Sequence, residues 1–243
     1  PIFGSALVTS NYNGSQLSCA GASDGRILVT ALGGTGTLSY LLNEIPGNVT
    51  GSITGIFTGL PAGTYTITVR DLNLCSLITA PVTITPPAAL SLVVNKTSNF
   101  NGRDISCFGA SDGRAEAVVT GGTGSYSYNW YSDPAMTISI GQMTAVAFNL
   151  PAGTYYVRVR DANNCSISTV VNITQPDVLS LTSGTVINVN CFGGHNGQAT
   201  IIASGGTVPY QFLWSSSNLI TPSLSGLGAG AYNVLVTDAN GCV

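Results

Sequence analysis

The chain repeats the same order of motifs three times. A cysteine motif occupies residues 18–26, 106–114 and 190–198, a Gly-Gly-Thr motif occupies residues 33–36, 121–124 and 205–208, and an Ala-Gly motif ending in tyrosine occupies residues 60–65, 150–155 and 227–232. The first cysteines of successive copies, Cys19, Cys107 and Cys191, are separated by 88 and 84 residues. Self-similarity at this period predicts tandem copies of one small module in place of one or two larger domains.

Proline residues indicate where one module ends and the next begins. Residues 82–86 and 171–176 each form a short alternating stretch that closes on a proline. We therefore expect modules at residues 1–86, 87–175 and 176–243. The third copy stops just after Cys242, so we expect its final strand to be missing.

The composition favours strands joined by tight turns. Only 7% of the residues are charged, 30 of the 243 are glycine, and no stretch keeps a helical period. Apolar and polar residues alternate instead, and Tyr155, Val157 and Val159 are expected to face inward. About six or seven short strands per module are typical of an immunoglobulin-like sandwich. We therefore predict an all-β chain of tandem immunoglobulin-like β-sandwich modules with one disulfide each.

Six cysteines fall two to a module, at separations of 56, 58 and 51 residues. A zinc site usually needs closely spaced cysteine pairs, and a nucleophilic cysteine needs a nearby base, for which His195 is the only histidine. One disulfide within each module explains both the number and the repeated placement. The predicted pairs are Cys19–Cys75, Cys107–Cys165 and Cys191–Cys242. Stable disulfides would place the protein in an oxidising compartment, such as the cell surface.

Acidic residues in two loops of each module offer a candidate calcium site. Asp24 and Asp112 follow the first cysteine of their modules, whereas Asp71 and Asp161 open the segment before the second cysteine. A disulfide inside each module would bring these two loops together, and Ca²⁺ prefers oxygen ligands. Aspartate in turns also accepts hydrogen bonds from local backbone, which is the more common role. No other metal and no other cofactor is expected.

Several aromatic residues could either pack or bind a ligand. Trp130 is expected in the core, and Tyr155 is expected to begin a tyrosine corner whose hydroxyl bonds nearby backbone. Phe108 and Phe192 follow the first cysteine of their modules, and packing against a neighbouring module is the favoured role over stacking on sugars. Tyr131 and Tyr156 are the candidate residues for contact with carbohydrate, because Tyr156 should face outward.

The same residues argue against several classes of function. With one histidine and few carboxylates, mostly in turns, no acid–base pair or triad can be assembled, so we do not expect an enzyme. The formal net charge of −3 gives no basic stripe for nucleic acid. The apolar stretches are short, so no transmembrane segment is expected.

Taken together, the motifs resemble the SprB-type repeat of giant surface adhesins in gliding Bacteroidetes. The resemblance rests on the Cys-x-Gly-x-x-Asp-Gly loop, the Gly-Gly-Thr-Gly turn before Tyr-x-Trp, the Leu-x-Ala-Gly-Thr-Tyr-x-Val strand and the Asp-x-Asn-x-Cys end. Two copies depart from it: the first has Leu42 in place of the aromatic and Leu72 and Leu74 around Asn73, and the third has His195 and Asn196 in the first loop. The resemblance implies a long filament outside the outer membrane, exported by the type IX system and moved by a motor.

We therefore expect a structural stalk or filament region of a large secreted cell-surface adhesin, of the gliding-motility type. Its expected partners are neighbouring repeats of the same chain, with surface polysaccharide or the outer-membrane motility machinery as further candidates. Two alternatives remain at this stage: modules that bind polysaccharide directly, and accessory modules of a secreted hydrolase.

Overall fold

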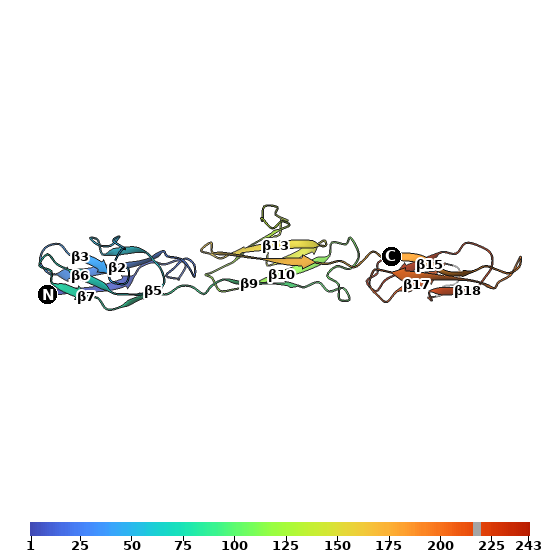
Figure 1. Cartoon of the computed structure of the whole chain (residues 1–243), viewed down its shortest axis with the longest axis horizontal. Coiled ribbons are helices and arrows are strands. Elements are labelled where there is room, and N and C mark those ends of the chain that lie inside the picture. The colour runs from blue at the N-terminus through green and yellow to red at the C-terminus, as the bar shows by residue number, and fades with distance from the viewer. Residues whose placement is uncertain (216–219) are drawn as a thin grey trace. The chain divides into compact units, whose positions relative to one another are not determined.

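Alternation of apolar and polar residues produces strands throughout the chain. The structure, a computed structural model, describes residues 1–215 and 220–243. Every regular element in these residues is a β-strand, and the strands of the three repeats are coloured in turn from blue to red in Figure 1. The predicted all-β class is confirmed.

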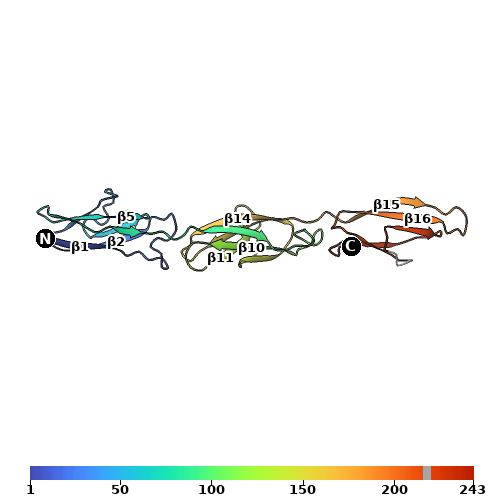
Figure 2. The ribbon, with the colours of Figure 1, turned by 90° about the horizontal axis from the view of Figure 1, so that it is seen from below.

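The first repeat contains eight strands in three sheets. They are β1 (Ile2–Val8), β2 (Gly25–Gly33), β3 (Ser39–Leu42), β4 (Ile56–Leu60), β5 (Gly63–Tyr65), β6 (Ile67–Arg70), β7 (Ser76–Ile78) and β8 (Val82–Ile84). The sheet orders are β1-β2-β4, β3-β6-β7 and β5-β8, and the paired strands are antiparallel. β1 and β2 lie side by side over seven paired residues (Figure 2).

The first repeat is a sandwich because its strands bury alternate side chains against one another. Ile27 and Val29 of β2 belong to the same core as Ile67 and Val69 of β6, and Phe57 of β4, with no exposed surface, is part of it. Each fully buried side chain of this size stabilises the fold by about 1.5–3 kcal/mol. The core therefore joins the two three-stranded sheets as an immunoglobulin-like domain does.

The second repeat contains β9 (Ser91–Lys96), β10 (Gly113–Thr120), β11 (Ser127–Tyr131), β12 (Val146–Leu150), β13 (Gly153–Arg160) and β14 (Ser166–Ile173). The sheet orders are β12-β10-β9 and β11-β13-β14. Tyr155, Val157 and Val159 of β13 are buried, as predicted from alternation. Trp130 of β11 is also fully buried, and its indole N–H donates a hydrogen bond to the Thr144 carbonyl (3.0 Å).

The third repeat contains β15 (Ser180–Ile187), β16 (Gly197–Ser204), β17 (Gln211–Trp214), β18 (Ser223–Leu227) and β19 (Val234–Thr237). The sheet orders are β15-β16-β18 and β17-β19. Phe212 and Trp214 of β17 are buried opposite Val236 and Val234 of β19, their partners in the antiparallel register. These two aromatic residues therefore belong to the core of the third repeat.

A tyrosine corner closes each repeat. The hydroxyl of Tyr65 donates to the Pro61 carbonyl at 2.8 Å, and the hydroxyl of Tyr155 donates to the Pro151 carbonyl at 2.9 Å. In the third repeat the Tyr232 hydroxyl donates to the carbonyl of Gly228 at 3.0 Å. The prediction of a structural role for this tyrosine is confirmed.

Contacts along the chain gather into two compact units. Unit 1 comprises residues 1–93, 119–128 and 158–168, and unit 2 comprises residues 94–118, 129–157 and 169–243. The division falls inside the second repeat, so each unit holds residues from two consecutive repeats.

Candidate functional site: the junctions between repeats

The cysteine loop of each repeat is held in shape by its own side chains. In the first repeat the Asp24 carboxylate accepts a hydrogen bond from the Ser18 N–H (3.1 Å), and in the second the Asp112 carboxylate accepts one from Ser106 N–H (3.1 Å). Asn196 makes the corresponding contact in the third repeat. An acid and an amide can both accept this bond, which explains how the third copy replaces aspartate without losing the turn.

A small hairpin precedes the cysteine in the first two repeats. Its tip is Asn-Tyr-Asn-Gly at residues 11–14 and Asn-Phe-Asn-Gly at residues 99–102. Asn13 and Asn101 take positive φ angles of 52° and 50°, a conformation that asparagine tolerates better than most residues. The hairpin tip therefore presents an asparagine amide at a fixed place beside the cysteine loop.

The second cysteine of each repeat lies in a loop built on an aspartate. In unit 1, one oxygen of Asp161 accepts the N–H of Thr123 (2.9 Å) and the other accepts the N–H of Cys165 (3.0 Å). Asp238 makes the same pair of contacts with Thr207 (2.8 Å) and Cys242 (2.9 Å) in unit 2. The aspartate thus fixes the cysteine loop to the Gly-Gly-Thr turn.

The corresponding aspartate of the first repeat is Asp71. Its oxygens accept the N–H groups of Thr35 and Cys75, each at 2.9 Å. The hydrogen bond from Thr35 is the main cause of a pKa below the usual range for Asp71, and the bond from Cys75 lowers the pKa further against the opposing effect of burial. The carboxylate is therefore ionised when it holds this loop.

The disulfides join different repeats. Cys19 of the first repeat is bonded to Cys165 of the second, and Cys107 of the second is bonded to Cys242 of the third, with Cα–Cα distances of 5.8 and 5.7 Å. The predicted pairs Cys19–Cys75, Cys107–Cys165 and Cys191–Cys242 are therefore wrong. Cys75 and Cys191 are free and exposed.

Distance along a strand explains why a bridge inside one repeat does not form. The Cys19 loop leads into Gly25 at the start of β2, whereas the Cys75 loop is bonded through Asp71 to Thr35, just beyond the end of β2 at Gly33. Nine residues of strand separate these ends by roughly 26 Å. A disulfide needs Cα atoms within about 7 Å. The first cysteine therefore finds its partner in the following repeat.

An asparagine side chain reinforces the first junction. The Asn163 amide donates to the carbonyls of Tyr12 (3.2 Å) and Ser18 (3.1 Å). In return the Asn13 amide donates to the Asn163 side-chain oxygen at 2.6 Å. Hydrogen bonds thus run in both directions beside the Cys19–Cys165 bridge.

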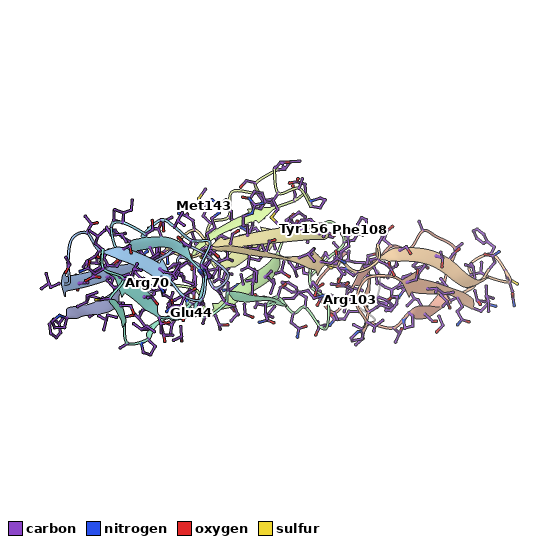
Figure 3. The ribbon with its side chains drawn as sticks, turned by 60° about the vertical axis from the view of Figure 1, so that its left-hand side comes forward. Glu44, Arg70, Arg103, Phe108, Met143 and Tyr156 are labelled. Atoms are coloured by element: carbon purple, nitrogen blue, oxygen red, sulfur yellow. A yellow bond between two sulfur atoms is a disulfide. The ribbon has the colours of Figure 1, made fainter. Side chains whose placement is uncertain are left out.

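The second junction repeats the main contacts of the first. The Asn240 amide donates to the carbonyls of Phe100 (3.3 Å) and Ser106 (3.0 Å), and the Asn101 amide donates to the Asn240 side-chain oxygen (2.6 Å). Arg103, which closes this hairpin through its backbone pairing with Phe100, is labelled in Figure 3. We call this set of hydrogen bonds between two asparagine side chains and two backbone carbonyls the asparagine clamp. It accompanies both disulfides.

The linker that joins two repeats is pinned to the same region. The Gly122 N–H donates to the Ala88 carbonyl at 2.8 Å, and the Gly206 N–H donates to the Asp177 carbonyl at 2.9 Å. At Gly121 (φ +76°) a Cβ atom would lie 2.0 Å from the Ala89 carbonyl oxygen. Only glycine allows this approach, which accounts for the repeated Gly-Gly at the turn.

The acidic residues considered for calcium serve these loops. Asp24 and Asp71 lie at opposite ends of the first repeat, so the repeat does not bring them together as the expected disulfide would have done. Asp112 and Asp161 accept backbone N–H groups in their loops. No group of three or more His, Cys, Asp or Glu residues gathers as in a metal site within residues 1–215 and 220–243.

The aromatic residues considered for ligand contact or packing range from half-buried to fully exposed. Tyr131 and Tyr156 are both half-buried, and Tyr131 also pairs through its backbone with Ser139. Phe108 is 54% exposed and borders the second junction together with Val178 and Leu179, whereas Phe192 is fully exposed (Figure 3 labels Phe108 and Tyr156). Phe108 thus lines a hollow at the second junction, and its packing against the next repeat stays a prediction.

Sequence reasoning missed the asparagines of the clamp. The signal was present, because Asn-x-Asn-Gly precedes the first cysteine in the first two copies and Asp-x-Asn-x-Cys ends every copy. Asparagine in such motifs is a common turn former, which is sufficient to explain it within one repeat. Their side chains face another repeat, which only the pairing of repeats reveals.

A family model matches one segment of each repeat. The model of the family described as SprB repeat matches residues 11–47, 99–134 and 183–219. These segments include the first cysteine of each copy, whereas Cys75, Cys165 and Cys242 lie outside them. No curated protein sequence matches the chain.

Solved structures resemble the chain only remotely. A C-terminal fragment of intimin, solved with the intimin-binding domain of its translocated receptor, has a TM-score of 0.33 and 10% identity, over 76% of this chain and 67% of that one. Domains 4–9 of the surface layer protein SbsC have a TM-score of 0.31 and 13% identity (96% and 42% covered). Eight immunoglobulin domains of Down syndrome cell adhesion molecule have a TM-score of 0.28 and 12% identity (89% and 29% covered).

Proposed function

Because the SprB repeat model matches three segments of the chain, we propose that the chain is a connecting region of a large surface adhesin, with a structural role and no catalytic one. In this proposal the parent protein is exported by the type IX system, stands on the outer surface of the cell and serves gliding motility. The repeats form the stalk of a filament and hold an adhesive part away from the cell. Within the described residues no helix is long and apolar enough to cross a membrane.

The observation that carries the proposal is the junction between repeats. A stalk must transmit tension from one module to the next without relying on a single flexible linker. Here each junction combines a disulfide, an asparagine clamp and a pinned linker. In the chain-entropy model, closing loops with separations of 146 and 135 residues stabilises the folded state by roughly 5 kcal/mol each.

The bridges also limit how far the chain can extend. The shortest covalent route runs from Pro1 to Cys19, crosses to Cys165, returns to Cys107 and crosses to Cys242. This route contains about 80 residues, which span about 270 Å when stretched, against about 830 Å for the whole chain of 243 residues. A tether of this kind resists overstretching even after its modules unfold.

Single-molecule pulling of the oxidised fragment, held by its two ends, tests the mechanical part. We expect a final length near 270 Å, which grows to about 830 Å in reductant. The Cys165→Ser variant should lengthen in oxidising buffer to about 370 Å, because the route then runs from Pro1 directly to Cys107. Cys75→Ser is the matched control and should change nothing. Equal lengths with and without reductant would remove the mechanical argument.

Location and adhesion need a second experiment. Antibodies raised against the fragment should label intact cells of the source organism, and in a gliding organism the label should move along the cell. Unlabelled intact cells, with label appearing only after lysis, would contradict surface display.

Direct binding of polysaccharide is the competing function, and a glycan array separates the two. The stalk proposal expects no binding by the three-repeat fragment. Binding that is lost in Tyr156→Ala and kept in Tyr65→Phe, a change in the corner of the first repeat, would favour the carbohydrate-binding function instead.

A further inference from the structure

We propose that Cys75 and Cys191 are the two halves of another junction, which forms when this chain meets a further copy of the repeat. Cys191 would bond to the second cysteine of a following repeat, and Cys75 would bond to the first cysteine of a preceding one. The partner is thus a further SprB-like repeat, and it docks so that the first cysteine of one repeat meets the second cysteine of the next. The inference rests on the geometry of the two observed junctions and does not depend on the proposed function.

The face around Cys75 has the same shape as the two occupied faces. Asp71 holds Cys75 and Thr35 as Asp161 holds Cys165 and Thr123. Leu74 takes a φ of 63°, against 64° at the corresponding Asn164, although leucine gains nothing locally from this conformation. The loop is therefore preformed for a partner.

What differs at this face is exposure. Asn163 and Cys165 are half-buried in the first junction, whereas Asn73 and Cys75 are exposed. A docked repeat would cover Asn73 and Cys75, as the first repeat covers Asn163 and Cys165 in the first junction.

The loop around Cys191 is also exposed, and it corresponds to the other side of a junction, the side that supplies the first cysteine. The Gly194 N–H donates to the Cys191 carbonyl at 2.9 Å, as Ala110 does to Cys107 at 3.0 Å. Cys191 is exposed where Cys107 is half-buried, and Phe192 is fully exposed where Phe108 is 54% exposed. A repeat docked here would bury Cys191 as the third repeat buries Cys107.

The Cys191 face lacks one component of the clamp. The third repeat has no Asn-x-Asn-Gly hairpin, because β15 leads through Asn188 directly to Cys191. The Asn190 carbonyl, which corresponds to those of Ser18 and Ser106, remains to accept the partner's asparagine amide. Docking here keeps the disulfide and part of the clamp.

The two faces are different surfaces, so the contact between copies is head-to-tail. Such a contact adds copies in an open series and does not close on itself as a symmetric dimer does. A Cys75–Cys75 or Cys191–Cys191 bond would set two equal faces together, with no asparagine opposite a cysteine loop. The geometry therefore favours the mixed pair.

Forming the bond is a two-electron oxidation. Two thiols, one from each copy, lose two protons and two electrons and form one S–S bond. A disulfide-carrying oxidant accepts them: with oxidised glutathione, one disulfide is consumed and two molecules of reduced glutathione leave. The attacking group is the thiolate of either exposed cysteine.

The test uses two variants of the full fragment, Cys75→Ser and Cys191→Ser, each with one free cysteine. They are mixed in oxidised glutathione, and the products are separated without reductant and mapped by mass spectrometry. From equal amounts of the two variants, we expect the Cys191–Cys75 dimer to exceed either homodimer about tenfold, whereas random pairing gives about a twofold excess; the difference is a preference of about 1 kcal/mol. Statistical proportions of the three dimers, or no mixed dimer, would overturn the proposal.

A second variant separates docking from simple thiol reactivity. Asn73→Ala, placed in the Cys191→Ser protein, removes the clamp amide and leaves Cys75 in place. The proposal expects the mixed dimer to form several-fold more slowly, with the internal bridges Cys19–Cys165 and Cys107–Cys242 intact. An unchanged rate would show that the cysteines meet without the docked geometry.

Discussion

At the scale of single residues, one side chain in each junction makes contacts that no other residue type reproduces. Asn163 donates to two backbone carbonyls and accepts from Asn13. This requires an amide, because a carboxylate would lack the donor and a hydroxyl would lack the reach. The residue between the aspartate and the cysteine of the motif is therefore a specificity-determining contact between repeats.

Replacing Asn163 by alanine should weaken only the first junction. Loss of these hydrogen bonds lets the junction open more often, so dithiothreitol should reduce Cys19–Cys165 faster, on the order of tenfold. Cys107–Cys242 in the same molecule is the internal control, because Asn240 is untouched. Alkylation and mass spectrometry follow both bridges; equal acceleration of the two would contradict a local clamp.

Tyr155→Phe should destabilise the second repeat. The buried hydroxyl donates to the Pro151 carbonyl, and removing it leaves an acceptor without its partner, at a cost of about 1 kcal/mol. Tyr156→Phe, at the next position of β13, is the matched control and should change the free energy of unfolding far less. Urea titration of both variants measures the difference, and an equal loss in the two would dismiss the corner as a stabilising feature.

At the scale of strands and loops, Asp104 ties together the edges of a repeat. Its carboxylate accepts from the Lys96 ammonium at the end of β9 (2.8 Å) and from the N–H (2.8 Å) and hydroxyl (2.6 Å) of Thr174 just after β14. Burial opposes ionisation, but these hydrogen bonds outweigh it and lower the pKa of Asp104. The ionised form therefore stabilises the fold.

Asp104→Asn should lose about 2 kcal/mol of unfolding free energy at neutral pH. A lowered folded-state pKa gives stability that is complete above the unfolded pKa, about 4, and is lost as the pH falls through the folded value. The gap between the native protein and the variant should thus stay constant from about pH 7 to about 5 and shrink below about 4. Chemical denaturation across this range checks it; a gap that widens in acid would contradict the sign.

Elements of this kind also show what a sequence can and cannot predict. Alternation along β13 predicted that the side chains of Tyr155 and Val157 point into the core, because side-chain direction in a strand is a local property. The partner of Cys19 was not predictable in the same way. In a repeated chain, Cys75 and Cys165 have the same motif around them, so sequence spacing cannot distinguish a partner in the same repeat from one in the next. The length of β2 holds the Cys19 and Cys75 loops apart, and the partner of Cys19 therefore lies in the next repeat.

At the scale of the whole molecule, the two bridges enclose overlapping segments. Residues 107–165 lie inside both loops, and every peptide bond between Cys19 and Cys242 lies inside at least one. Tandem domains joined only by linkers have no such overlap.

A single cut should therefore leave the oxidised chain in one piece. A protease site inserted between Gly47 and Asn48 lies within the loop closed by Cys19–Cys165. After cleavage, a denaturing gel should show one band without reductant and two with it. The Cys19→Ser variant is the control and should separate in both lanes; separation of the oxidised native fragment would refute the pairing.

The overlapping bridges therefore give the chain redundant covalent connections. Each repeat is connected to the next by two covalent paths, one along the backbone and one through sulfur. From Ala20 to Gly241 the chain contains no peptide bond whose hydrolysis alone would separate the two ends. To separate the two ends, a backbone break between Cys19 and Cys107 must be joined by loss of the Cys19–Cys165 bond, or a break between Cys165 and Cys242 by loss of the Cys107–Cys242 bond.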